Sequence, residues 1–95
     1  YKKAISLKPD YAHPYHNIGH MLAIQGRYEE AVPFYKKAQQ YNPYEWKTYQ
    51  DLGQTYFMLG NYKEAKFQLE RAIEYGSAEA DRLRLILDEI ERKTQ

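Results

Sequence analysis

The chain of 95 residues contains no cysteine, which excludes disulfide bonds and thiolate metal sites but does not identify a compartment. It has no apolar run long enough to cross a bilayer and no signal-peptide pattern. It also lacks an excess of either charge, because 14 Lys and Arg stand against 13 Asp and Glu, a net charge of +1. This balance favours neither a nucleic-acid partner nor a membrane surface.

The recurrent motifs of catalysis are missing as well. There is no nucleophile elbow, no phosphate-binding loop and no dinucleotide-binding glycine pattern. Ser6 and Ser77 read as ordinary helix-end residues, and Glu29 and Lys63 belong to short charged runs typical of solvated helix starts. We therefore predict that this segment is not an enzyme and needs no cofactor.

What the chain does contain is a repeat with a period of 34 residues. Seven positions recur at that interval: Tyr15, Gly19, Gly26, Tyr28, Glu30, Ala31 and Ala38 return as Tyr49, Gly53, Gly60, Tyr62, Glu64, Ala65 and Ala72. The first ten residues fit the tail of a preceding unit, since Tyr1, Ala4 and Pro9 fall one period before Tyr35, Ala38 and Pro43. A period of this size indicates stacked supersecondary units.

The order of small, aromatic and proline positions resembles the tetratricopeptide repeat (TPR) family over nearly the whole chain. The first unit reads Tyr15-x2-Ile18-Gly19-x2-Leu22 and then Ala31-x3-Tyr35-x2-Ala38-x4-Pro43. The second reads Tyr49-x2-Leu52-Gly53-x2-Tyr56 and then Ala65-x3-Leu69-x2-Ala72. The resemblance implies an all-α solenoid of helical hairpins, a right-handed superhelix, in which each unit is an A helix followed by an antiparallel B helix.

The spacing has a physical reason. Gly19, Gly53 and Ala31 must be small if the A and B backbones are to approach closely. Gly26 and Gly60 are placed to end the two A helices at a C-cap. One unit cannot bury its apolar face alone, so neighbouring units must stack.

The expected organisation is one domain over 1–95: the end of a truncated repeat at 1–10, repeat units at 12–45 and 46–77, and a capping helix at 78–93. We expect a B-helix remnant over about 1–8, a break at Pro9 and Asp10, and helices over about 12–25, 28–41, 44–59, 62–75 and 78–93. Pro14 would then lie in a first turn, and Ser77 would be the N-cap of the last helix. Because the chain lacks an initiator Met and opens inside a helix, we expect it to be a piece of a longer protein.

The last helix departs from the repeat. It keeps one apolar stripe, but Leu87 replaces the glycine that would admit a B helix, and its outer face is heavily charged. Such a helix is suited to cap an array.

Tyrosine is abundant, with 11 residues. Most of them stand at repeat positions that prefer large side chains, which predicts core packing. A sugar-binding or RNA-stacking role for these rings is the alternative.

The family resemblance also implies which side chains face the concave groove. Its second, fifth, ninth, twelfth and thirteenth positions correspond here to His13, His16, His20, Ala23 and Ile24, to Lys47, Gln50, Gln54, Phe57 and Met58, and to Asp81, Arg84 and Asp88. Tyr44 is expected at the groove edge. The partner-binding prediction is His13, His16, His20, Ile24, Tyr44, Lys47, Gln50, Gln54, Phe57, Met58 and Arg84.

His16 and His20 lie one helical turn apart, a spacing that can chelate zinc when a third ligand converges. No carboxylate stands near them in sequence, so we predict hydrogen-bonding groove residues and no metal. TPR domains that bind the C-terminal carboxylates of heat-shock chaperones resemble one another in a Lys and an Asn at these two positions. That clamp is not visible here, because the two positions hold His16 and His20 in the first unit and Gln50 and Gln54 in the second. An upstream unit could still hold part of it.

The predicted function is a protein–protein interaction scaffold that holds a peptide or helix of a partner protein in the groove. One alternative is a self-assembly element that associates through its N-terminal half. Another is the TPR region of a larger enzyme or secretion component. The predicted partners are protein or peptide, with no nucleic acid and no membrane span.

Overall fold

The computed structural model describes residues 9–94, and side chains from residue 12 onward. This part of the chain folds into five helices and no strand: α2 (Pro9–Ile24), α3 (Tyr28–Tyr41), α4 (Trp46–Met58), α5 (Tyr62–Glu74) and α6 (Ala80–Lys93). None of these helices is long and apolar enough to cross a membrane. The all-α prediction is confirmed, whereas the helical remnant predicted over 1–8 lies outside the described residues.

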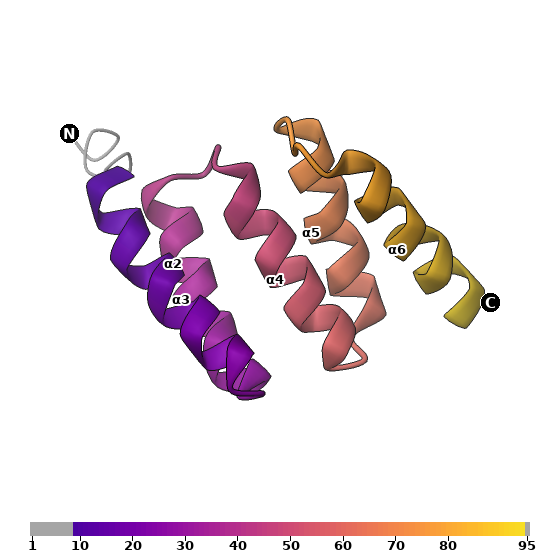
Figure 1. Ribbon diagram of the computed structural model, residues 1–95, viewed down its shortest axis with the longest axis horizontal. Coiled ribbons are helices and arrows are strands. Elements are labelled where there is room, and N and C mark those ends of the chain that lie inside the picture. The colour runs from indigo at the N-terminus through magenta and orange to yellow at the C-terminus, as the bar shows by residue number, and fades with distance from the viewer. Residues whose placement is uncertain (1–8, 95) are drawn as a thin grey trace.

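The helices pair as hairpins and stand side by side in a row (Figure 1). α2 packs chiefly on α3 and α4 chiefly on α5, while α3 meets α4, and α6 packs on α5. The row measures 44 × 27 × 20 Å, with α2 and α3 at one end and α6 at the other. Stacking of this kind gives each hairpin a neighbour that covers its apolar face.

The core runs through the row as one cluster. Its largest fully buried side chains include Tyr35 on α3, Leu52 on α4, Leu69 on α5, and Leu83 and Ile90 on α6. Full burial of such side chains contributes about 1.5–3 kcal/mol each before the entropic cost of ordering them. The apolar stripe of α6 therefore belongs to the same core as the repeat units.

Two glycines allow each hairpin to close. A Cβ on Gly19 would lie 3.0 Å from Cδ1 of Tyr35, and a Cβ on Gly53 would lie 2.7 Å from Cδ2 and Cγ of Leu69. The contact partners are the equivalent residues of the two B helices, 34 positions apart. The prediction that these positions must be small is confirmed.

The A helices end as predicted, at glycines in the left-handed region. Gly26 and Gly60 have φ of +81° and +79°. At the first turn Arg27 N–H bonds to the Leu22 carbonyl (2.9 Å), and at the second Asn61 N–H bonds to the Tyr56 carbonyl (2.9 Å). These six-residue closures are Schellman motifs, which satisfy carbonyls that a helix end otherwise leaves unpaired.

The first described helix begins earlier than predicted. Pro9 and Asp10 are its first two residues rather than a break before it, and Pro14 is an internal residue rather than a first-turn one. A proline suits the first helical position because its φ is already helical and its missing donor has no intrahelical partner there. Pro14 removes one donor inside the helix, as Pro33 does in α3.

Two other helices begin later than predicted, because side chains hold the preceding turns. Before α4, the side chain of Asn42 accepts the N–H of Tyr44 (3.4 Å). Before α6, the hydroxyl of Ser77 accepts the N–H of Glu79 (3.1 Å), and the N-cap position falls at Glu79. Ser77 therefore closes a turn rather than capping the last helix.

Candidate functional site

The predicted groove residues gather around two adjoining hollows lined by α2 and α4. The first, here called the histidine hollow, measures about 190 Å³. Residues that line it include His13, His16, Asn17, His20, Lys47 and Thr48. The second, here called the apolar hollow, measures about 350 Å³ and extends to α6. Its lining includes His20, Ile24, Gln54, Phe57, Met58 and Ile86, so His20 belongs to both.

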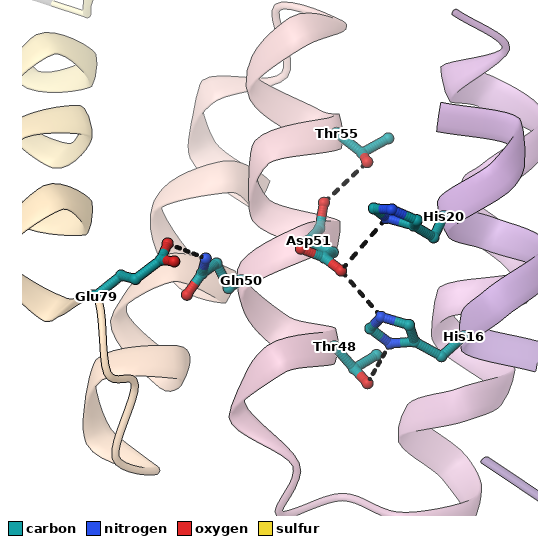
Figure 2. A network of polar contacts seen from close by, with 7 residues as sticks. All are labelled: His16, His20, Thr48, Gln50, Asp51, Thr55 and Glu79. Atoms are coloured by element: carbon teal, nitrogen blue, oxygen red, sulfur yellow. Dashed lines mark hydrogen bonds and ion pairs between the residues drawn. The ribbon is translucent and has the colours of Figure 1, made fainter. Parts of the chain in front are cut away.

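His16 joins the two repeat units through both of its ring nitrogens (Figure 2). Nδ1 lies 2.9 Å from Thr48 Oγ1, and Nε2 lies 2.9 Å from Asp51 Oδ2. The side chains of His16 and Asp51 are largely buried, and the edge of the imidazole packs on Tyr35 at a ring-centroid distance of 5.5 Å. With the proton on Nε2, Nδ1 accepts the threonine hydroxyl and the Nε2–H faces the carboxylate in a close electrostatic contact, so both nitrogens are engaged.

The carboxylate of Asp51 stands between two imidazoles. His20 is more exposed than His16, and its Nδ1 lies 4.0 Å from Asp51 Oδ2. Oδ2 is buried and makes no hydrogen bond of standard geometry, so its contacts with the histidines are chiefly electrostatic. On the main chain, the Asp51 carbonyl accepts the hydroxyl of Thr55 (2.8 Å). Of these two histidines His20 is therefore the more accessible, while both ring nitrogens of His16 face groups of the next repeat unit.

Gln50, expected in the groove, is used inside the protein. It is buried, it donates from Nε2 to Glu79 Oε1 (2.7 Å), and it accepts the hydroxyl of Ser77 (2.9 Å). Figure 2 shows its side chain pointing toward Glu79 and away from Asp51. The sequence predicts that Gln50 faces the groove, and the structure instead buries this amide, which ties α4 to the turn before α6.

Two other expected groove residues line neither hollow. The ring of Tyr44 packs edge-on against Tyr75 at 5.9 Å, and Arg84 makes an exposed ion pair with Asp81 at 3.2 Å. The residues that the structure brings together are the remaining eight: His13, His16, His20, Ile24, Lys47, Gln54, Phe57 and Met58.

Sequence reasoning missed Thr48, Asp51 and Arg82, all of which line a hollow. Thr48 and Asp51 are the third and sixth residues of the second unit, positions that the groove pattern does not include. The signal in the sequence was weak, since their partner His16 lies 32 and 35 residues away. The pattern that could have indicated this contact is a polar residue at the fifth position of one unit together with polar residues at the third and sixth positions of the next unit.

The structure places a carboxylate beside the two histidines of the zinc alternative, but the arrangement is not a metal site. Asp51 joins His16 and His20 from another helix, which the sequence did not indicate. Within the described part of the chain, however, no group of three His, Asp or Glu side chains is arranged to hold a metal ion. His16 already uses both nitrogens, so it has no lone pair to offer without breaking its contact with Thr48 or Asp51.

Two tyrosines near the site are held as neutral packing groups. Burial raises the pKa of the Tyr35 phenol well above its usual value, and the negative charge of Asp51 acts in the same direction. Burial also raises the pKa of Tyr49, whose hydroxyl donates to the Pro43 carbonyl (2.8 Å). Both rings serve the core, as their repeat positions predicted.

Comparison with known proteins agrees with this architecture. The family model of the tetratricopeptide repeat matches residues 10–76. Among solved structures, the chain is similar to one described as YrrB, a TPR protein with an unusual peptide-binding site, with 31% identity and a TM-score of 0.78. That match covers 87% of this chain and 42% of the other, so the chain spans less than half of that relative's length. No match was found among curated proteins. The period, the hairpins and the family match lead to one conclusion: the chain belongs to the tetratricopeptide repeat family.

Proposed function

We propose that this chain holds a peptide or helical segment of a partner protein in the groove formed by α2, α4 and α6, without catalysing a reaction. Family membership supports the general role of a protein-interaction scaffold. The described peptide site of the similar structure makes a peptide ligand a reasonable extension to this chain. A groove along the A helices is also what the resemblance to the tetratricopeptide repeat family implies.

The observation that carries the proposal is the continuity of the two hollows through His20. Several side chains at this surface have no partner elsewhere in the described residues. Among residues 12–94, the side chains of His13 and Lys47 make no hydrogen bond or ion pair, and Ile24 is 70% exposed despite its apolar character. A surface that combines free donors with uncovered apolar groups is suited to a mixed polar and apolar segment.

The test begins with a random peptide library displayed on phage and selected on the immobilised chain. Affinity of the selected peptides is then measured for Lys47→Ala and for Lys63→Ala, a matched exposed lysine that lines neither hollow. We expect the first change to weaken binding and the second to leave it unaltered, with helicity preserved in both. Equal losses, or a selection that enriches no peptide, would count against the groove.

A second candidate function, self-assembly, rests on a different observation. Ile18 on α2 is 42% exposed, whereas Leu52, its equivalent one repeat later, is 0% exposed. Part of the α2 face that corresponds to a buried face of α4 is therefore exposed. Light scattering would test this: Ile18→Lys should lower any association at high concentration, whereas Phe67→Lys, on an exposed site of α5, should not. A parent chain that stays monomeric would refute it.

A further inference from the structure

We propose that the apolar hollow is a specificity pocket for one large, uncharged aliphatic side chain of a bound peptide, and that Gln54 donates a hydrogen bond to the peptide main chain beside it. The proposal rests on the proposed function and states which residue of the partner the groove selects. The occupant is an extended segment of a partner protein with leucine or methionine at the anchoring position.

The lining of the hollow sets the chemistry of the side chain. Phe57, Met58 and Ile86 supply apolar walls from α4 and α6, and Ile24 supplies one from α2. Met58 is 59% exposed and can adapt to its neighbour, because a thioether side chain is unbranched and polarizable. At about 350 Å³ the hollow stands near the small end of ligand pockets, which fits a side chain and its adjoining main chain.

The charges at the rim argue for an uncharged occupant. Arg82 is engaged in an ion pair with Glu79 at 2.5 Å. The Asp51 side chain is only 15% exposed, and His16 and His20 both lie against its Oδ2, so little of the carboxylate is open to the hollow. Arg82 is thus already paired and the Asp51 carboxylate is largely covered, so an acidic or basic side chain entering the hollow would lose water and find little exposed counter-charge in return.

Gln54 adds a directional element. Its Nε2 is buried and has no hydrogen-bond partner among the described residues, although the residue lines the hollow. A buried donor without a partner is unfavourable, and a small rotation of this flexible amide would bring it to an acceptor placed in the hollow. A main-chain carbonyl next to the anchoring side chain is such an acceptor, and every extended peptide carries one.

The experiment uses blocked pentapeptides with glycine on both sides of a central residue: leucine, methionine, alanine, aspartate or lysine. Each is titrated to millimolar concentration into the ¹⁵N-labelled chain, followed by amide shifts. We expect leucine and methionine peptides to shift the amides of Ile24, Phe57 and Met58, together with the side-chain amide of Gln54. The alanine, aspartate and lysine peptides are expected to bind at least about fivefold more weakly.

Two pairs of variants distinguish binding in the apolar hollow from contact with the surface outside it. Met58→Ala should weaken the leucine peptide by about tenfold, whereas Met21→Ala, which is equally exposed at 58% but lies outside the hollow, should not. Gln54→Leu keeps the size of the side chain and should weaken every peptide that binds by about two- to tenfold, whereas Gln25→Leu should change nothing.

The outcomes distinguish this inference from the broader proposal. Stronger binding of the aspartate or lysine peptide, with shifts at His13 and Lys47, would overturn the pocket while leaving groove binding intact. If no peptide shifts any amide, the pocket proposal is wrong. The phage selection would then test separately whether the groove binds peptides. An unchanged affinity for Gln54→Leu would remove the hydrogen bond from the proposal.

Discussion

The contact between α4 and α5 at Gly53 gives the sharpest test of the hairpin. In an open helix, Gly→Ala stabilises by about 1 kcal/mol because alanine has the higher helix propensity. Here the new Cβ would lie 2.7 Å from Cγ and Cδ2 of Leu69 and 3.2 Å from its backbone nitrogen. Leu69 is fully buried, so neither the side chain nor the backbone can move away freely.

The gain in helix propensity and the steric conflict with Leu69 have opposite effects on stability, and the steric effect should be the larger one. Overpacking a core costs about 1–3 kcal/mol. After the gain in propensity, we expect Gly53→Ala to lower the free energy of unfolding by about 1 kcal/mol, and Gly53→Leu to lower it further. In a domain of this size, 1 kcal/mol corresponds to a fall in melting temperature of about 4–8 °C.

The cause can be isolated with a double-mutant cycle followed by circular dichroism. Leu69→Ala removes the two side-chain atoms in conflict and leaves the backbone nitrogen at 3.2 Å. By itself this change costs about 2–5 kcal/mol, so the cycle is measured in a stabilising osmolyte. In that background Gly53→Ala should lose most of its cost, because the remaining contact is the 3.2 Å approach to the backbone nitrogen. The control is Gly60→Ala, where no atom lies near the new Cβ but φ is +79°, so its cost should be the same in both backgrounds. A higher melting temperature for Gly53→Ala alone would refute the close approach of α4 and α5.

Three further changes test the contacts between units. Asp51→Ala removes the carboxylate beside His16 and should lower the free energy of unfolding by about 1–3 kcal/mol, measured by urea titration. An unchanged urea midpoint would show that this contact does not contribute to stability. Gln50→Ala deprives Glu79 of a donor and should cost a similar amount by the same assay, contrary to what a free groove residue would do. Because the pKa of Tyr35 is raised, the folded state holds the phenol proton more tightly than the unfolded chain does. The free energy of unfolding should therefore be retained below about pH 10 and decrease above it. Tyr35→Phe should make this decrease less steep, and an equally steep decrease in the variant would assign it to other groups.

The sequence determined the hairpins because their rules are local and periodic. A glycine that must take positive φ, such as Gly26, and one that must admit a neighbouring helix, such as Gly19, leave a mark at a fixed interval in the chain. The apolar stripe of the last helix likewise follows from the 3.6-residue period. These features needed no knowledge of which units touch.

Tertiary structure decided what the polar residues of the A helices do. His16 and Gln50 both occupy the fifth position of a unit, and the repeat gave both the same expectation of a free groove residue. Each instead bonds to the following unit or turn, because stacking brings polar partners within reach that lie 27 to 35 residues further along the chain. Such contacts depend on the offset and rotation between neighbouring hairpins, which a period does not specify. The same stacking leaves His20, Ile24 and Met58 uncovered, and so it determines which of the predicted residues remain available to a partner.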